Sequence, residues 1–309
     1  MQATQSPGKP RRKWLLWSLV IGLFMIVAVL VVSLRPAWHL ARTVSNDSDS
    51  LPPLPLGHVD DASRLNQTKV HAVESLPVAI EDAERQLAIL LERARASGRK
   101  VSIAGARHSM GGHTIYPGGI AIDMLPLNAM KLDLNTDTLH VEAGALWKDV
   151  IAYLDSFDRS VAVMQSNNSF SVGGSISVNC HGWQFGRPPI ASTVRGFRLM
   201  KADGTIVQCS RDENTQLFSL VLGEYGLFGI ILDVDLEVVP NRRYRRQQFV
   251  VPAEQSLAAF DEVLQKHPDV PLIYARMNVT ADQFLGEVIL NVFHDEPSAD
   301  GSLPPLEAP

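Results

Sequence analysis

The segment SIAGARHSMGGHT, residues 102–114, places two histidines, one arginine and several small residues directly behind a short apolar run. His108 has the chemistry of a metal ligand, a general base or a covalent attachment point, and Arg107 has that of a phosphate contact. The glycines let backbone N–H groups approach an anion closely, because no Cβ intervenes. The segment therefore predicts ligand chemistry, and on its own it leaves the kind of ligand open.

Two further glycine-containing segments have the same character, SVGGS at residues 171–175 and GEYGLFG at residues 223–229. Each lies beside the predicted start of a helix or a strand, where backbone N–H groups are open to an anion. Three such segments favour a large phosphorylated cofactor, although each one alone is equally well an ordinary tight turn. The chain lacks the glycine patterns G-x-x-x-x-G-K-[ST] and G-x-G-x-x-G, which disfavours a P-loop nucleotide triphosphatase and a Rossmann domain.

The other reactive side chains do not form a recognisable metal site. His108, His113 and His181 have no cysteine or carboxylate partner at the spacing of metal ligands, so we expect no metal. Cys180 and Cys209 are the only cysteines, and they lie outside any C-x-x-C spacing. They form either one disulfide bridge or two buried free thiols, and we favour the free thiols.

The elements that must position these segments alternate between helices and hairpins. Apolar residues recur at helical spacing over residues 77–97, and they alternate about the turns at residues 135–137 and 203–204 as they do in β-hairpins. The other predicted elements are strands at 100–104, at 118–124 and at the end of 223–239, short helices at 146–154 and 213–222, and a glycine turn that opens a helix within 169–177. Hairpins between helices, without a repeating βαβ pattern, predict an α+β fold.

A boundary follows the last of these strands. Pro240 and the basic run NRRYRR, residues 241–246, precede another strand-and-helix segment over residues 249–293. The four arginines of this run are most simply a solvated strand face, and an anionic substrate or a lipid headgroup is the alternative partner. The final residues, from Asp295 onward, have the composition of a loop.

The amino-terminal part of the chain is strongly apolar. Residues 14–34 carry no charged side chain, and as a helix of about 30 Å they are long enough to cross a bilayer. The basic residues before them predict a cytoplasmic N-terminus and a folded part on the periplasmic or extracytoplasmic side. The alternatives are a cleaved signal peptide and a twin-arginine export signal at Arg11 and Arg12. We favour an uncleaved single-pass anchor, because the apolar stretch is longer than that of a signal peptide.

Bulk composition sets wider limits. The 309 residues are enough for about two domains, and a hydrophobic content of 46% supplies a sizeable core. A net charge of −5 argues against nucleic acid as a partner.

Three segments together resemble a known family. AGARHSMGGH at residues 104–113, SVGGSISVNCHG at 171–182 and YGLFGIILDVDLEVVP at 225–240 occur in the order found in the FAD-binding domain of the vanillyl-alcohol oxidase / p-cresol methylhydroxylase (PCMH-type) superfamily. The resemblance covers residues 60–240, and it is strongest to the branch of aldonolactone and alditol oxidases and dehydrogenases. Three motifs in order are far more specific than any one of them.

The resemblance implies a flavoprotein with an α+β, PCMH-type FAD-binding domain of two subdomains and a separate cap domain. The expected organisation is a cytoplasmic tail at 1–13, a transmembrane anchor at 14–34, a linker at 35–57, the FAD-binding domain at 58–240 and the start of a cap at 241–309. Family members continue past the cap with a segment that returns to the FAD domain. This chain ends within the expected cap, so the cap is incomplete and the catalytic base is unassigned.

The resemblance also assigns cofactor-binding residues. His108 matches a histidine that often bonds covalently to the 8α-methyl of the flavin, and small neighbours leave room for such a bond. His113 fills a place often taken by glutamine, His181 matches a His-Gly pair beside the flavin, and Ile230 matches a residue that holds the cofactor through its main chain. The remaining implied contacts are Ala104, Gly105, Ala106, Arg107, Ser109, Ser171, Gly173, Gly174 and Ser177.

The chemistry implied is transfer of hydride from a CH–OH group of a polyol, sugar or lactone to flavin N5, with oxygen, a quinone or a cytochrome as the electron acceptor. The alternatives are a noncatalytic flavin-binding or electron-relay protein and a truncated, inactive paralogue. A reductase of the same fold is disfavoured by the predicted anchor.

Overall fold

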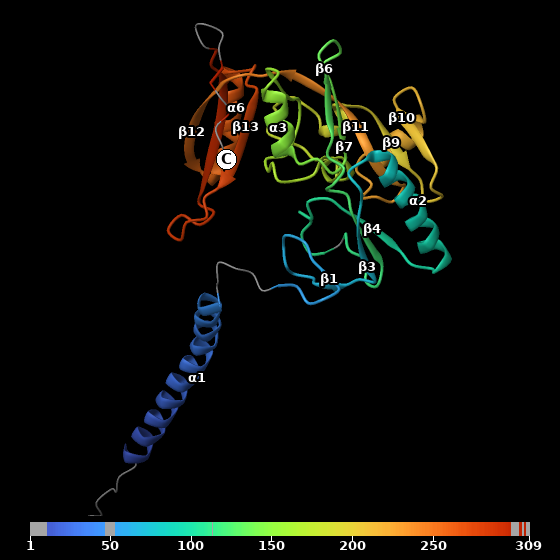
Figure 1. Cartoon of the computed structure of the whole chain (residues 1–309). Helices are drawn as coiled ribbons and strands as arrows, with labels where there is room; N and C mark the ends of the chain where they lie inside the picture. The colour runs from blue at the N-terminus through green and yellow to red at the C-terminus, as the bar shows by residue number, and fades with distance from the viewer. Residues whose placement is uncertain (1–10, 47–52, 113, 298–302, 305, 307–309) are drawn as a thin grey trace, which may run out of the picture. The chain divides into compact units, whose positions relative to one another are not determined.

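The structure is a computed structural model that describes residues 11–46, 53–112, 114–297, 303–304 and 306. Figure 1 shows its helices and strands. The chain divides into two compact units, Met1–Pro53 and Leu54–Pro309. The first unit holds the apolar helix, and the second holds all three glycine-containing segments.

Helix α1, Arg11–Asn46, is 36 residues long and continues through Pro36. Within it, residues 19–42 are long and apolar enough to cross a membrane, with a mean hydropathy of 2.5, and a signal sequence near the N-terminus has the same properties. The predicted span 14–34 lies within this helix. The predicted linker at 35–57 begins later than expected, because residues 37–42, AWHLAR, are mostly good helix formers that extend the helix beyond the proline.

The second unit begins with the short hairpin of β1 (His58–Val59) and β2 (Thr68–Lys69), followed by a parallel sheet. This sheet has the order β3-β5-β4, with β3 at Ala72–Ser75, β4 at Val101–Ala104 and β5 at Ile120–Asp123. Helix α2, Ile80–Ala96, connects β3 to β4, so these elements form one βαβ unit. The sequence predicts α2, β4 and β5 but not the parallel pairing, because β3 is too short to show a pattern.

Helix α2 is amphipathic and has clear end signals. Ala83, Leu87, Leu90 and Ala94 are buried at spacings of four, three and four residues, which places them on one face. The first turn contains acidic residues and the last turn basic ones, as the helix dipole favours. Gly98 follows with φ +65°, and the adjacent N–H groups bond back to the last carbonyls.

The larger sheet is antiparallel and has the order β10-β9-β11-β7-β6, with β8 also paired to β11. Its strands are β6 (Met130–Asp133), β7 (Thr138–Glu142), β8 (Arg159–Val161), β9 (Val194–Met200), β10 (Ile206–Ser210) and β11 (Ile230–Pro240). Three helices accompany it: α3 (Trp147–Asp155), α4 (Val172–Ser177) and α5 (Thr215–Val221). Both predicted hairpins, β6–β7 and β9–β10, are confirmed by the pairing.

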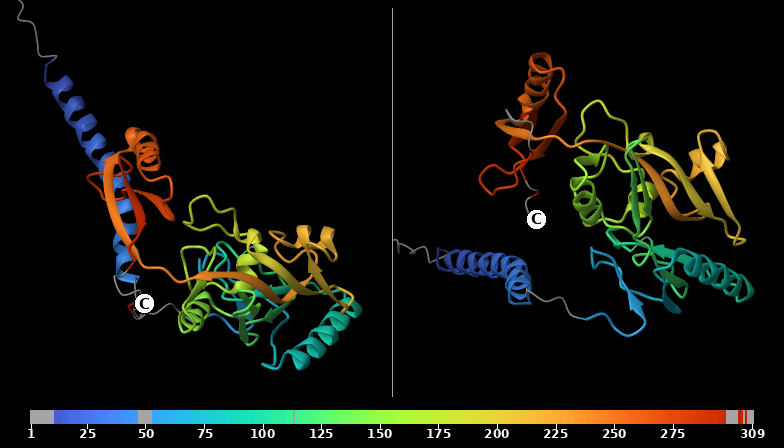
Figure 2. Two further views of the ribbon diagram at one scale, coloured as in Figure 1. Left: turned by 90° about the horizontal axis from the view of Figure 1, so that it is seen from above. Right: turned by 45° about the horizontal axis from the view of Figure 1, so that its top comes forward.

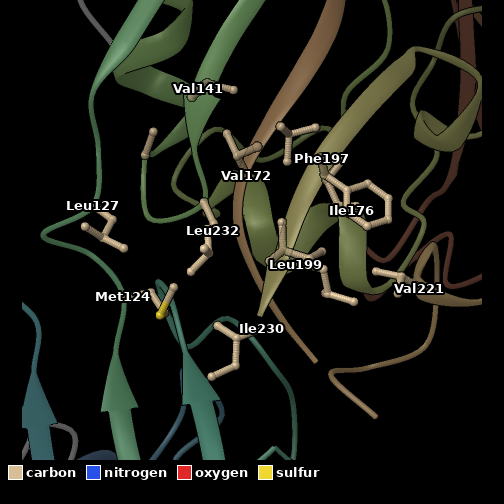
Figure 3. Close-up of a cluster of buried hydrophobic side chains, with 14 of the residues drawn as sticks. Met124, Leu127, Val141, Val172, Ile176, Phe197, Leu199, Val221, Ile230 and Leu232 are labelled. Atoms are coloured by element: carbon tan, nitrogen blue, oxygen red, sulfur yellow. The ribbon is translucent and has the colours of Figure 1, made fainter. Parts of the chain in front are cut away.

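One hydrophobic core joins these elements. Figure 3 shows Met124 and Leu127 near Ile230 and Leu232, with Val172 and Ile176 among side chains from β9 and β11. Arg198 on β9 forms salt bridges across this core. Its guanidinium pairs with Asp233 on β11 and, at 2.7 Å, with Glu84 on α2. The side chain of Asp233 is almost completely buried, so this pair holds α2 and the larger sheet together.

A third sheet, β12-β14-β13, follows β11 and carries helix α6. Its elements are β12 (Tyr244–Pro252), α6 (Ser256–Lys266), β13 (Leu272–Met277) and β14 (Glu287–Asp295). They enclose a small core of their own, and Figure 2 shows the chain passing from β11 into this part. The basic run is exposed but not simply solvated, because Arg242 pairs with Asp295, and Arg243 and Arg245 pair with Glu296.

Candidate functional site

The loop between β4 and β5 carries the first glycine-containing segment. Its residues 105–109 are half-buried, and Arg107 takes a left-handed backbone with φ 54°. Within the described part of the chain, the N–H groups of residues 105–109 have no hydrogen-bond partner. A run of unpaired N–H groups in a half-buried loop is a suitable binding surface for an anion.

The first and second segments meet at Gly105. A Cβ on Gly105 would overlap the side chain of Ser171, the buried residue that precedes α4. A Cβ on Gly173 would lie 2.9 Å from the Cβ of Ala143, and the Gly173 N–H donates to the Ala143 carbonyl at 2.8 Å. The predicted glycine turn is therefore the first turn of α4, and its glycines permit this close approach.

Gly174 differs from Gly105 and Gly173 because it is exposed. A Cβ there would meet only Ser171 Oγ, at 3.0 Å, and the Gly174 N–H has no partner among the described residues. It therefore adds one more free donor to those of the first loop. Ser177, one turn further on, is half-buried, and its carbonyl accepts the N–H of Tyr225 at 3.0 Å.

His108 is held by the residues just before α4. Its ring stacks on Phe170 with centroids 4.6 Å apart, and its Nε2 lies 2.9 Å from Ser169 Oγ. The single proton of the Ser169 hydroxyl is committed to Asn167 Oδ1 at 2.6 Å, so Ser169 Oγ accepts from His108. His108 Nε2 therefore carries a proton, and the lone pair of the neutral ring lies on Nδ1.

The third segment packs against the end of α4 through two backbone hydrogen bonds, Gly223 to Ile176 and Tyr225 to Ser177. The structure corrects the expectation that this segment presents its N–H groups to an anion. Glu224 is buried and accepts the N–H of Phe228 through Oε2 at 2.9 Å, while Oε1 is buried without a partner among the described residues. Burial raises the pKa of Glu224, and bonds from Phe228, Gly226 and Leu227 only partly offset this.

The other predicted residues take different places. Ile230 begins β11 opposite Met200, and its side chain lies in the core (Figure 3). Ala104 ends β4, and its carbonyl accepts the N–H of Met124. Ala106 and Ser109 are half-buried in the first loop, and His181 is exposed. His113 lies outside the described residues.

Several side chains of the site have no signature in the sequence. Asp61 and Ser63 bond the first loop, and Ser169 and Phe170 hold His108. They are common residue types at unremarkable spacings, and Asp61 is separated from Ser109 by 48 positions. Among these residues, the sequence indicates only Ser169 and Phe170, because they directly precede the second glycine-containing segment, SVGGS.

A buried polar network lies beneath α4. Trp147 Nε1 donates to Ser175 Oγ at 2.8 Å, Ser175 Oγ donates to Gln165 Oε1 at 2.9 Å, and the Cys180 thiol donates to the same oxygen. Burial raises the pKa of Cys180 to about 11. Both Cys180 and Cys209 are free thiols, as predicted, although Cys180 is only partly buried. Among the described residues no group of three or more metal-ligating side chains is present.

Comparison with known proteins finds a match to an FAD-binding domain. Residues 77–210 match the family model described as "FAD binding domain". The chain is similar to L-gulonolactone oxidase of Mus musculus, with 28% identity over 191 residues that cover 62% of this chain and 42% of the relative. It is also similar to cytokinin dehydrogenase 10 of Oryza sativa subsp. japonica, with 29% identity over 68% of this chain and 41% of the relative. The chain thus spans about two fifths of the length of these relatives.

The residues present fit FAD. The dinucleotide carries a pyrophosphate, and the free N–H groups of residues 105–109 and of Gly174 are the donors that such an anion needs. The contact between Gly105 and Ser171 brings these two segments together, and a side chain at residue 105 would collide with Ser171 and push the segments apart. His108, with its lone pair on Nδ1, lies in the same loop.

Proposed function

Because residues 77–210 match the FAD binding domain family model, we propose that the protein is an FAD-dependent oxidoreductase that oxidises a CH–OH group of a polyol, sugar or lactone. The observation that carries the proposal is that Gly105 and Gly174, whose N–H groups are both free, lie against the same side chain, Ser171, while His108 of the first loop contacts the residues just before it. The relative named L-gulonolactone oxidase supports the lactone or sugar class.

When bound, FAD supplies a two-electron acceptor for hydride at flavin N5. The chain's own residues bind and orient it. The N–H groups of residues 105–109 and Gly174 would donate to the pyrophosphate, and the lack of a side chain at Gly105 lets the first loop lie directly against Ser171. Phe170 and Ser169 fix the ring of His108, so its Nδ1 points away from the hydroxyl that holds Nε2.

His108 is the proposed point of covalent attachment. The bond would join His108 Nδ1 to the 8α carbon of the flavin, and two bonds would break: one C–H bond of that carbon and the N–H bond at His108 Nε2. Two electrons and two protons leave in this step, and molecular oxygen accepts them to give hydrogen peroxide. Fluorescence that stays with the band on a denaturing gel, and is lost in His108→Ala but kept in a control variant of an exposed histidine outside the site, His71→Ala, would support the bond. Fluorescence retained by His108→Ala would contradict it.

The proposed location is a membrane, with α1 as an uncleaved single-pass anchor and residues 58–309 on the periplasmic or extracytoplasmic side. Electrons would then pass to oxygen, a quinone or a cytochrome. The exposed apolar side chains along residues 19–32 support this location. Recovery of the full-length chain in carbonate-washed membranes is the expected result, and a soluble chain that has lost residues 1–34 would instead identify a signal peptide.

Anaerobic reduction tests the function itself. The purified chain, supplemented with FAD, is mixed in turn with L-gulonolactone, sorbitol and a cytokinin, and the visible flavin band is followed. Bleaching by the lactone or the polyol is the expected result. Bleaching by the cytokinin alone would overturn the proposed substrate class, flavin binding without any bleaching would identify a relay protein, and a colourless protein would overturn the whole proposal.

A further inference from the structure

A short turn outside the matched domain holds the first glycine loop in place. We call residues 61–63, between β1 and β2, the clamp. Ala62 N–H donates to the carbonyl of Arg107 at 2.9 Å, and Gly111 N–H donates to Ser63 Oγ at 2.8 Å. Asp61 Oδ2 accepts both the Ser109 hydroxyl at 2.9 Å and the Gly112 N–H at 2.6 Å. Four hydrogen bonds thus join the clamp to residues 107–112.

Asp61 is the centre of this arrangement. Only 4% of the residue is exposed, and each of its carboxylate oxygens accepts two donors. Oδ1 accepts the N–H and the hydroxyl of Ser63, at 3.0 and 2.5 Å, and Oδ2 accepts the two donors from the loop. A buried carboxylate needs such donors, and two of the four are available only while the loop keeps this conformation.

The bonds of the clamp bracket His108 closely. The carbonyl of Arg107, just before His108, accepts the N–H of Ala62. The hydroxyl of Ser109, just after His108, donates to Asp61. Arg107 also has φ 54°, in the left-handed region that a non-glycine residue adopts only when its surroundings hold it there. The clamp therefore holds the part of the loop whose N–H groups are unpaired.

We propose that Asp61 is a positioning residue for FAD, which acts by holding residues 105–112 in the conformation that binds the pyrophosphate and presents His108. It acts through the loop and does not touch the cofactor. This inference rests on the proposed function and goes beyond it, because Asp61 precedes the matched residues 77–210. It extends the functional domain to the turn between β1 and β2.

The chain offers a matched control at the neighbouring position. Asp60 is also a buried carboxylate, but its Oδ1 accepts only the N–H of Asp61, and its Oδ2 has no partner among the described residues. Asp61→Asn and Asp60→Asn are thus the same chemical change one residue apart. Only Asp61→Asn removes an acceptor from the clamp, since the single amide oxygen that remains can accept from Ser63 or from Gly112 and Ser109, but not from all of them.

The test is FAD binding by the full chain in detergent, carried out in a His108→Ala background so that binding is reversible. We expect Asp61→Asn to raise the dissociation constant at least about tenfold, equivalent to about 1.4 kcal/mol, and Asp60→Asn to change it less than about twofold. A positioning role also predicts that flavin bound to Asp61→Asn loses the fine structure of its visible band, which loss of global stability alone would not cause.

Each outcome has a distinct meaning. If the parent chain binds FAD and Asp61→Asn binds it equally well, the clamp proposal fails while the proposed function stands. If the parent chain binds no FAD, the proposed function fails first. If Asp61→Asn does not fold, as judged by circular dichroism, Ser109→Ala replaces it, because it removes one donor to Asp61 and leaves the carboxylate in place. Unchanged affinity in Ser109→Ala would then contradict the proposal.

Discussion

The loops at residues 105–112 and 223–229 are both glycine-rich, and both enclose a buried carboxylate, but they obtain it from different places. The first loop bonds Asp61, which belongs to a separate turn of the chain. The second loop bonds Glu224, which belongs to the loop itself. The first loop therefore keeps the N–H groups of residues 105–109 free, whereas the second uses its own N–H groups to solvate its own side chain.

The electrostatics of the two carboxylates differ for the same reason. Burial would raise the pKa of Asp61, but hydrogen bonds from Ser63, Gly112 and Ser109 outweigh it and lower the pKa to about 2. Burial raises the pKa of Glu224, and its fewer donors do not compensate. The first loop, which has no carboxylate of its own, thus keeps N–H groups for an external anion, whereas the second loop donates to its own Glu224.

The largest expected effect is the difference in the free energy of unfolding between the variants Asp61→Ala and Glu224→Ala. Asp61→Ala leaves the Ser109 hydroxyl and the Gly112 N–H without their acceptor, so we expect a loss of about 3 kcal/mol in the free energy of unfolding. Glu224→Ala removes a group that is already poorly solvated and should cost less. Urea unfolding at pH 7 measures both, and an equal or larger loss in Glu224→Ala would contradict the comparison.

The same pair predicts opposite behaviour in acid. The folded pKa of Asp61, about 2, lies below its unfolded value near 3.8, so its contribution to stability is complete above about pH 4 and is lost as the pH falls toward 2. Asp61→Ala should flatten this acid limb of the stability profile. Glu224→Ala should leave it in place.

Replacing two glycines of the site should change the free energy of unfolding by different but smaller amounts. A methyl group at residue 105 would overlap Ser171, so Gly105→Ala should cost about 2 kcal/mol and weaken FAD binding. Gly174→Ala meets only Ser171 Oγ at 3.0 Å and gains helix propensity, so its stability should change by less than about 1 kcal/mol. Thermal unfolding without FAD separates the two, and equal losses would show that the contact at Gly105 is relieved by movement of Ser171.

The smallest expected effect concerns the charge of Glu224. Because its folded pKa is raised, the native state loses stability as the pH rises from the unfolded pKa toward the folded one. Glu224→Gln keeps an oxygen for the Phe228 N–H and cannot ionise, so this decline should disappear. Unfolding free energies measured between pH 4 and 8 test this, and a parallel decline in the variant would assign the slope to another group.

Much of the fold follows from local patterns. The turns at residues 135–137 and 203–204 predict their hairpins because strand alternation on both sides leaves one consistent register. Helix α2 is equally clear from its buried stripe and from Gly98. The parallel β3-β5-β4 sheet is not predictable in this way, because its pairing joins short strands separated by α2 and by the loop itself. The boundary expected at residue 240 stays a prediction, since residues 54–309 form one compact unit.

The sequence by itself indicates the residue types of the site, the glycines and His108. It also indicates the order of the three segments that resemble an FAD domain. Glycine and histidine have backbone and ring properties that hold in any context, and a linear pattern can therefore reveal them. Which N–H groups stay free, which nitrogen of His108 bears the proton, and the roles of Asp61 and Glu224 depend on hydrogen bonds between distant segments. Those bonds exist only once packing excludes water and obliges each buried polar group to find its partner.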